Sequence, residues 1–305
     1  MLVSFCIKCF NQEAYIEGAL KAAFAQTYRP LEIVISDDAS TDRSVAIIEK
    51  CIADYRSAGG DIPVVLIKND RNLGNVGNWQ KLCEVAKGEV LVKADGDDVS
   101  HADRAARIMA HWGPEVKCLV HAADTMDVDG RRLGTFAKAD GCFGAASAYA
   151  RETYSKFGPI DYAESADDEV YLARAKMLGV VKQIDERLVD YRIGSGFSSI
   201  RNDFRNRMHK NYIRTWESRK QSVRDGDCLG VEAAVRARLV EAEQREAAMV
   251  ELWSEEPWVR RWCAYARCEH GPFGSKVWSV RLLQLLPRRI SDWVVNALAA
   301  VRHSL

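Results

Sequence analysis

The sequence predicts an α/β fold in which a mostly parallel sheet is flanked by helices, followed by a helical C-terminal region. Short apolar runs alternate with segments of helical spacing over roughly the first 125 residues. Several of these runs are apolar on both faces, as strands of a covered parallel sheet are. Past residue 198 the sequence changes to charged, amphipathic segments. The alternation predicts βαβ units and a doubly wound sheet.

Five apolar runs are expected to form strands, at 2–9, 31–36, 63–67, 90–94 and 118–122. The segments between and after them have helical spacing, at 14–25, 42–55, 78–86 and 103–112. Beyond the last of these runs, Asp129-Gly130 predicts a hairpin.

The C-terminal region is expected to begin near residue 200, which divides the chain into domains 1–200 and 201–305. Helices are expected at 204–219 and 231–253, with a turn at Asp225-Gly226 between them. From residue 276 onward five Lys or Arg residues accompany an apolar helical stripe, which suits an interfacial helix on a membrane. A helix packed on the protein's own core or on a partner fits the same pattern.

Composition excludes some classes of protein. The 305 residues are 48% apolar, enough for a packed core, and Lys plus Arg equals Asp plus Glu at 43 each. Because a nucleic-acid binder carries a basic excess, no nucleic-acid partner is expected. The N-terminus does not resemble a signal peptide, and no apolar run approaches the length of a membrane span, so we expect a cytoplasmic protein.

The nine cysteines form no disulfide framework, and their odd number favours reduced thiols. Cys6 and Cys9 have the spacing of a CxxC pair, but an odd separation in a strand places them on opposite faces. Buried strand residues are therefore the expected interpretation. Cys263, Cys268 and His270 suggest a metal site only weakly, because a fourth ligand is lacking nearby.

Polar loops follow the first four predicted strands: CFNQ, SDDASTD, NDRNLGNVGN and ADGDD. The carboxyl ends of parallel strands meet at one edge of a sheet, where ligands of such folds bind. The small residues at 141–147 would let a substrate approach the backbone closely. These loops define a candidate site.

The ADGDD loop places Asp95, Asp97 and Asp98 within four residues, where like charges repel unless a cation lies among them. A solvated acidic loop is the simplest alternative. An EF-hand is excluded because Ser100 and Ala106 stand where its glycine and closing glutamate are required. A Mg²⁺ or Mn²⁺ ion shared with a substrate diphosphate fits the pattern.

Asp37 and Asp38 also follow a buried strand. Together with Ser40, they fit a turn that begins a helix, with the carboxylates near its positive end. Carboxylates at a strand end also accept hydrogen bonds from the base and ribose of a nucleotide. Both interpretations remain open for this pair.

Taken together, these loops resemble the nucleotide-sugar-binding half of the family 2 glycosyltransferases, which have the GT-A fold. The segments SFCIKCFNQEAYIEGALKAAFAQTY, LEIVISDDASTD and RNLGNVGNWQKLCEVAKGEVLVKADGDD carry the resemblance over about the first 100 residues. It implies that ADGDD is the metal motif of the family, with Asp97, Asp95 and Asp98 as ligands. The residues that the resemblance implies for donor binding are Phe10, Asn11, Asp37, Asp38, Asn72, Gly74, Asn78 and Asp95.

The segment FGPIDYAESADDEVYLARAKMLG resembles the acceptor side of the same family. Counting back from Arg174 places the family's acidic pair on Asp167-Asp168, which implies that Asp168 is the catalytic base. The usual Glu-Asp is Asp-Asp here. The segment YRIGSGFSS, at 191–199, resembles the family's Tyr-Arg segment without the histidine that often follows, and Cys9-Phe10 also departs from the usual pattern.

The resemblance implies an inverting transferase that moves a sugar from a nucleoside-diphosphate sugar to a saccharide, free or lipid-linked, in surface polysaccharide or glycolipid assembly. A polyprenyl-phosphate sugar synthase and a non-catalytic nucleotide-binding scaffold are the alternatives. A dinucleotide-dependent oxidoreductase is disfavoured because no GxGxxG follows the first strand. A nucleotidyltransferase would require a glycine-rich, basic first loop, which CFNQEA is not.

Overall fold

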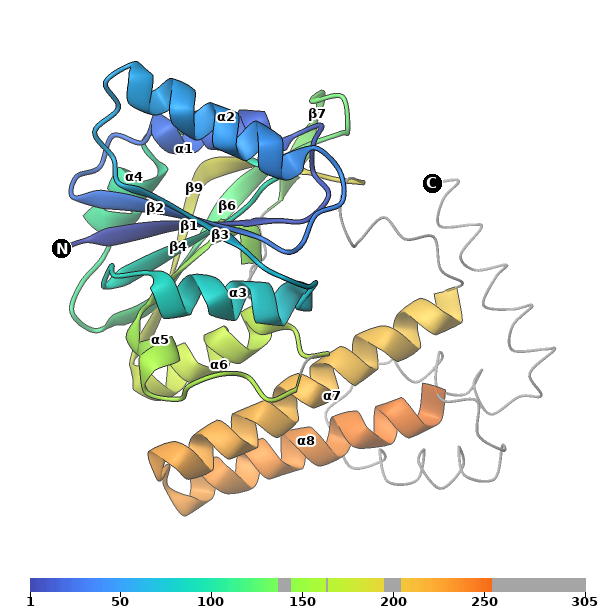
Figure 1. Ribbon diagram of the computed structural model, residues 1–305. Coiled ribbons are helices and arrows are strands. Elements are labelled where there is room, and N and C mark those ends of the chain that lie inside the picture. The colour runs from blue at the N-terminus through green and yellow to red at the C-terminus, as the bar shows by residue number, and fades with distance from the viewer. Residues whose placement is uncertain (137–143, 163, 195–203, 254–305) are drawn as a thin grey trace. The chain divides into compact units, whose positions relative to one another are not determined.

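The computed structural model describes residues 1–136, 144–162, 164–194 and 204–253 (Figure 1). The chain forms two compact units. The first comprises Met1–Ala163 and Asp167–Ile200, and the second comprises Glu164–Ala166 and Arg201–Leu305. Some predicted features lie outside the described residues. They are the small residues at 141–143, the part of the Tyr-Arg segment after Gly194, the weak metal site of Cys263, Cys268 and His270, and the apolar stripe near the C-terminus.

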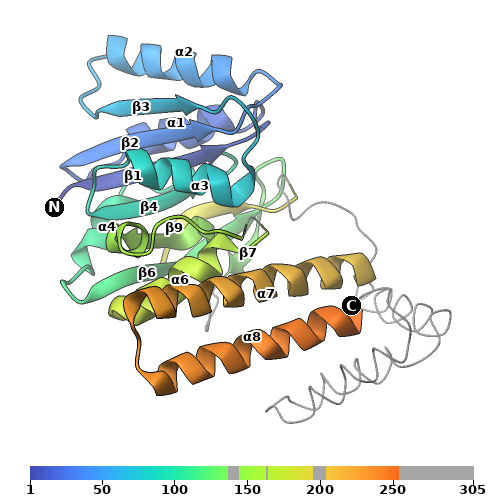
Figure 2. The same cartoon turned by 60° about the horizontal axis from the view of Figure 1, so that its bottom comes forward.

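The first unit is built on a mixed sheet with the strand order β3-β2-β1-β4-β8-β6-β9-β5, in which β7 pairs with β6. Strands β1 to β4 are parallel, and Figure 2 shows them in the order β3, β2, β1, β4 from top to bottom; β8 is antiparallel to both of its neighbours. Beyond it β6 and β9 run parallel. The strands of the described residues are β1 (Val3–Cys9), β2 (Leu31–Asp37), β3 (Val64–Lys68), β4 (Val90–Asp95), β5 (Val99–Ser100), β6 (Val116–Met126), β7 (Arg132–Phe136), β8 (Ser147–Ala150) and β9 (Val180–Arg192).

Helices cover both faces of this sheet (Figure 1). One face packs against α1, α2 and α4, and the other against α3 and α6. Cys9 belongs to the first apolar cluster and Cys6 to the second, so the two buried thiols lie on opposite faces as expected. The α/β fold with a mostly parallel sheet is thereby confirmed. The helical segments are α1 (Ile16–Phe24), α2 (Ser44–Ser57), α3 (Gly74–Val85), α4 (Arg104–Ala110), the 3₁₀ turn η1 (Gly144–Ala146), α5 (Glu152–Ser155) and α6 (Asp167–Leu178).

This unit differs from the sequence prediction in several features, among them the unpredicted short strands β5 and β8. The third helix begins at Gly74 instead of residue 78, because a carboxylate from another loop caps its first N–H groups, as described below. Strand β9 was not predicted at all, since its charged sequence VVKQIDERLVDYR has little apolar alternation. Its position comes from pairing with β6 and β5. The hairpin at Asp129-Gly130 is confirmed, with Gly130 at φ +84° between β6 and β7.

The second unit contains α7 (Phe204–Leu229) and α8 (Ala233–Trp253), which lie side by side (Figure 1). The turn predicted at Asp225-Gly226 is wrong, because α7 continues to Leu229 and ends at Gly230, with φ +67°. The Asp225 carboxylate accepts a hydrogen bond from Gln221 Nε2 at 2.8 Å, one turn earlier. A Cβ atom at Gly226 would lie 2.9 Å from Leu239 Cδ1, so this glycine permits close helix packing. No helix in the described ranges has the length and apolar character of a membrane span.

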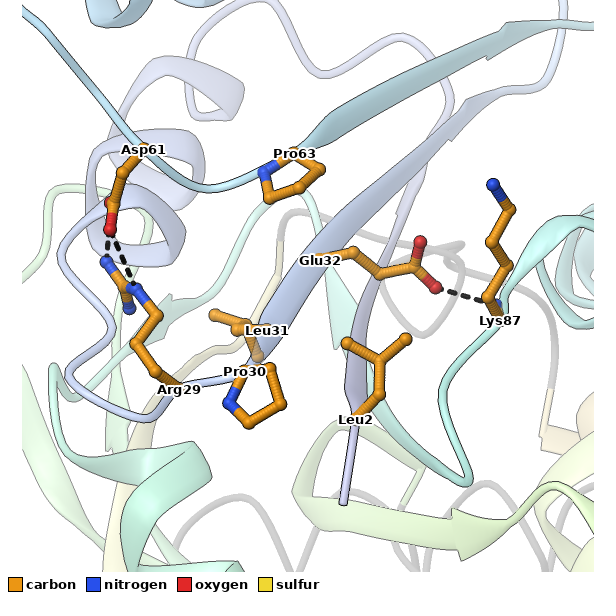
Figure 3. Close-up of a pocket in the computed structure, with 8 residues that line it drawn as sticks. All are labelled: Leu2, Arg29, Pro30, Leu31, Glu32, Asp61, Pro63 and Lys87. Carbon is orange, nitrogen blue, oxygen red and sulfur yellow. Dashed lines mark hydrogen bonds and ion pairs between the residues drawn. The ribbon is translucent and has the colours of Figure 1, made fainter.

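An open hollow of about 630 Å³ lies at the amino ends of β1, β2 and β3, opposite the polar loops (Figure 3). Three of its charged side chains, those of Arg29, Asp61 and Glu32, have partners at the hollow. Arg29 pairs with Asp61 at 2.8 Å, and the Glu32 carboxylate accepts the Lys87 N–H at 2.6 Å. Because ligands of such sheets bind at the carboxyl ends of the strands, this hollow is not the candidate site.

Candidate active site

The carboxyl ends of β1, β2 and β4 are aligned with one another. Lys8 lies opposite Asp95 in the pairing of β1 with β4, and Cys9 lies opposite Asp37 in the pairing of β1 with β2. The loops CFNQ, SDDASTD and ADGDD therefore start at the same level of one sheet edge. This edge is the one that the sequence predicts as the site.

Asn11 and Asp37 join the first two loops to each other. The Asp37 carboxylate accepts hydrogen bonds from the N–H and the Oγ of Ser40, at 2.9 and 2.6 Å. The Asn11 N–H donates to Ser40 Oγ at 2.8 Å, and Asn11 Oδ1 accepts the Thr41 N–H at 2.8 Å. Phe10 follows β1 with 44% of its surface exposed, which leaves the ring accessible at this edge.

Asp38 caps the start of α3 from a different loop. Its carboxylate accepts the N–H groups of Leu73 at 2.8 Å and Gly74 at 2.9 Å, and the Asn69 side-chain amide at 3.0 Å. The buried carboxylate thus satisfies backbone donors that a helix start leaves unpaired. In this structure Asp38 shapes the third loop.

The other predicted residues of this loop lie nearby. The Gly74 N–H also donates to Asn72 Oδ1 at 2.9 Å, and Asn72 is exposed. Asn78 is buried inside α3, where its amide donates to the Ser36 carbonyl at 3.3 Å. Asn78 therefore fastens α3 to the end of β2.

Replacing Asp38 with alanine is expected to lower the free energy of unfolding by about 2 kcal/mol, because the helix start loses its cap and partly buried N–H groups lose their acceptor. Asp38→Asn keeps one carbonyl oxygen and should recover roughly half of the loss. The midpoint of urea unfolding, measured at constant slope, checks this. Equal stability of the alanine variant and the parent would contradict the capping role.

The acidic loop is surrounded by cationic and backbone donors. Lys8 Nζ lies 3.1 Å from Asp95 Oδ1. Asp98 Oδ1 accepts the Arg192 N–H at 2.8 Å, while Asp98 Oδ2 is buried without a hydrogen-bond partner among the described residues. Burial, with Asp97 and Asp95 adding to it, raises the pKa of the Asp98 carboxyl well above its usual range. A Cβ atom at Gly96 would lie 3.0 Å from the Lys8 carbonyl, so the loop passes close to β1.

Arg192 fastens the acidic loop to β9. Its Nε donates to the Asp97 carbonyl at 3.0 Å, and Nη1 donates to the carbonyls of Asp127 and Val128 at 2.9 Å. The guanidinium lies 4.5 Å from the centre of the Tyr15 ring. This arginine belongs to the Tyr-Arg segment that the sequence singled out, and its contacts hold the loop in place.

Arg104 is a fully buried cation that supports the segments next to the acidic loop. Its guanidinium donates to the carbonyls of Lys93 and Ala145 at 2.8 Å and to Ser100 Oγ at 2.9 Å. Burial lowers the pKa of Arg104 to about 10, against the opposing influence of Asp98 and Asp95, so the group is charged at neutral pH. It joins α4, β4 and η1 beneath the site.

These contacts determine which kind of metal site the loop could form. In the portion of the chain that the structure describes, no three His, Cys, Asp or Glu residues are arranged to hold a metal ion. Asp95 is paired with Lys8, and one oxygen of Asp98 accepts the Arg192 N–H. A cage made of protein ligands alone does not fit. A hard cation that takes one or two carboxylates, centred on Asp97, and completes its shell with diphosphate and water oxygens does fit.

The acidic pair opens α6, and its two members have different surroundings. Asp167 is buried, forms an ion pair with Lys93, and accepts the Asn75 amide at 2.8 Å. Asp168 is partly exposed, and its Oδ1 accepts the Glu169 N–H at 3.1 Å. Of the two carboxylates, Asp168 is the one that solvent reaches more easily.

Arg174, which set the sequence alignment of the pair, is fully buried. It donates to the carbonyl of Gly158 at 2.9 Å and lies over the rings of Phe157 and Tyr171. This arginine therefore packs α6 against the segment around α5.

Three polar residues that sequence reasoning missed connect the acidic loop after β4 to the acidic pair that opens α6. Lys8 Nζ donates to Asn75 Oδ1 as well as pairing with Asp95, Asn75 donates to Asp167, and Asp167 pairs with Lys93. A detectable signal was present, because Lys8 and Lys93 interrupt apolar strands and lysine is almost never buried without a partner. Asn75 gave no such signal.

Parts of the sequence are similar to known proteins. Residues 4–151 match the model of Glycosyl transferase family 2. An uncharacterized glycosyltransferase from Nostoc is 29% identical over 217 residues, which is 63% of this chain and 65% of that protein. The succinoglycan biosynthesis protein ExoO of Rhizobium meliloti is 30% identical over 139 residues, which is 45% of this chain and 38% of ExoO. This chain thus spans less than two thirds of the length of these relatives.

Solved structures share the fold at low sequence identity. TarS of S. aureus in complex with UDP-GlcNAc superposes with a TM-score of 0.56 at 17% identity, over 88% of each chain. The mannosyltransferase PcManGT of Pyrobaculum calidifontis, in complex with GDP-Man and Mn²⁺, gives a TM-score of 0.59 at 15% identity, over 96% of this chain and 83% of that chain. Residues 4–151 are thus similar to glycosyl transferase family 2, and the chain shares its fold with these solved structures.

Proposed function

We propose that this chain transfers a sugar from a nucleoside-diphosphate sugar to a hydroxyl of a saccharide acceptor, with inversion at the anomeric carbon. One observation carries the proposal: the acidic loop after β4 and the acidic start of α6 belong to one connected site. Lys8 and Asn75 link Asp95 to Asp167, and Lys93 links β4 to the same aspartate. The acidic loop can therefore bind the nucleotide-sugar donor while a base at the start of α6 acts on the acceptor hydroxyl.

Asp168 is the proposed general base, because it is the more exposed member of the pair that opens α6. It takes the proton of the acceptor hydroxyl while the hydroxyl oxygen bonds to the anomeric carbon. The bond from that carbon to the diphosphate breaks, and its electron pair leaves with the diphosphate. Attack opposite the leaving group inverts the configuration.

Asp97, with Asp95 beside it, is proposed to hold Mg²⁺ or Mn²⁺ together with the diphosphate of the donor. When bound, the cation supplies positive charge that stabilises the departing diphosphate. The carboxylate chemistry of the loop and the Mn²⁺ of the PcManGT complex support this assignment. Lys8 is 3.1 Å from Asp95 and adds a second cation to the donor side.

The remaining donor contacts are proposed from the loops at the same edge. The exposed ring of Phe10 offers a face for the nucleobase, and Asn11, Asp37 and Asp38 with Asn69 shape the surrounding loops. Asp95, Asn72, Gly74 and Asn78 complete the proposed donor set. The complexes of TarS with UDP-GlcNAc and of PcManGT with GDP-Man support a nucleotide sugar as the donor class.

A lipid-linked saccharide in surface polysaccharide or glycolipid assembly is the proposed acceptor, and residues 1–200 form the proposed catalytic domain. ExoO is named for succinoglycan biosynthesis, and WfaP of Escherichia coli is named for glucosyl transfer to GlcNAc-diphosphoundecaprenol. WfaP is 36% identical over 97 residues, which is 32% of this chain and 36% of WfaP. Contact with the inner face of the membrane is part of the same proposal.

A donor screen tests the proposal. UDP-, GDP- and dTDP-sugars are incubated with the protein, Mg²⁺ or Mn²⁺, and soluble or lipid-linked saccharides, and the released nucleoside diphosphate is measured. We expect acceptor-stimulated release with one nucleotide and its loss on chelation of the metal. Nucleotide-dependent thermal stabilisation without release from any donor would indicate a scaffold. A polyprenyl-phosphate sugar as the product would indicate the synthase instead.

A further inference from the structure

Lys93 is a buried lysine in β4 between the apolar residues Val92 and Ala94. Its side chain is 2% exposed and forms an ion pair with the Asp167 carboxylate, which is 3% exposed.

Several elements hold the ammonium group in place. It pairs with Asp167 of α6 and lies 5.3 Å from the centre of the Trp79 ring on α3. A Cβ atom at Gly144 of η1 would lie 2.9 Å from Lys93 Nζ, so this glycine leaves room for the group. The Lys93 carbonyl is fixed by Arg104 at 2.8 Å.

Stability alone does not account for such a pair. Two charges removed from water pay a desolvation cost that their attraction often fails to exceed, and an apolar pair of similar volume is frequently as stable or more so. The pair also fixes the position of one chain segment relative to another. Lys93 lies two positions before Asp95, and its partner Asp167 directly precedes Asp168.

We propose that Lys93 is a positioning residue for sugar transfer: by holding Asp167, it sets the place of the Asp168 carboxylate relative to the acidic loop of residues 95–98. The hydrogen bonds from Lys8 to Asn75 and from Asn75 to Asp167 form a second connection between β1 and Asp167, through α3. This inference rests on the proposed function, in which Asp168 is the base.

The test is Lys93→Met in the full chain. We expect kcat to fall about 10²-fold, the loss that a misplacement of about 1 Å can cause. The affinity for the nucleoside diphosphate that the donor screen identifies, measured with Mn²⁺ by calorimetry, should change little. Lys117→Met is the matched control, since Lys117 is a mostly buried lysine in the same unit whose ion-pair partner is Glu152, at 3.0 Å, and not the acidic pair. It should leave kcat unchanged.

A second variant separates positioning from stability. Lys93→Met leaves the buried Asp167 carboxylate without its cation and should lower Tm, whereas Lys93→Met with Asp167→Asn removes both charges and should recover most of the Tm. We expect kcat of the double variant to stay low. Recovery of kcat together with Tm would show a purely structural pair and overturn the inference.

Gly144→Ala tests the same contact if Lys93→Met does not fold. Its Cβ would lie 2.9 Å from Lys93 Nζ and displace the ammonium without removing a charge. We expect a fall in kcat with nucleotide binding intact, and an unchanged kcat would overturn the inference. If Asp168→Asn is inactive while Lys93→Met keeps the parent kcat, the inference alone fails. If Asp168→Asn is fully active, the proposed function fails.

Discussion

Asp168→Asn is expected to lower kcat by about 10² or more, on the scale of general-base loss. Asparagine keeps the size of the side chain and a carbonyl oxygen for the Glu169 N–H, but it cannot take a proton. Steady-state kinetics with the donor and acceptor from the screen measure the effect. Binding of the nucleoside diphosphate with Mn²⁺ should barely change, because the proposed role of Asp168 is toward the acceptor and not the donor.

Asp167→Asn is the comparison that the structure makes informative. Because Asp167 is buried against Lys93, its replacement leaves a buried ammonium without its main partner and is expected to lower stability by about 3 kcal/mol. Asp168→Asn, at a partly exposed position, should hardly alter stability. If Asp167→Asn abolished transfer at unchanged Tm while Asp168→Asn remained active, the roles of the two residues would be reversed.

Asp97→Ala is expected to abolish metal-stimulated transfer while the protein stays folded. The side chain belongs to a loop at the end of β4, and the variant retains the loop's backbone contacts, among them the hydrogen bond from Arg192 Nε to the Asp97 carbonyl at 3.0 Å. Removing the central carboxylate leaves Asp95, which is paired with Lys8, as a poor remaining ligand. A titration of activity against Mn²⁺, with circular dichroism as the check on folding, measures the result.

Asp129→Ala is the control for the loss of a loop carboxylate, since Asp129 is exposed in the hairpin between β6 and β7. It should leave both activity and metal dependence unchanged. If Asp97→Ala still transferred sugar with a normal response to Mn²⁺, the metal would not bind at the acidic loop.

The sequence by itself determined the parallel half of the sheet. Strands buried on both faces need apolar residues at consecutive positions, and the runs 2–9 and 90–94 show this pattern directly. The polar loops were readable because each directly follows an apolar run, whereas the acidic pair was located through the resemblance to the family, by its spacing from Arg174. The alternation of strand and helix then fixed which loops share an edge.

Only the tertiary structure decided the roles within those loops. Asp37 and Asp38 are neighbours in sequence, yet one closes a turn on Ser40 and the other caps α3 from 35 residues away. Asp167 and Asp168 are likewise adjacent, and Lys93 distinguishes them from 74 residues away. The turn after α7 and the strand β9 were misread or missed because their positions depend on packing and on pairing with distant strands. Local propensity depends only on the neighbours of a residue along the chain. The position of a buried charge depends on its partner in the folded structure.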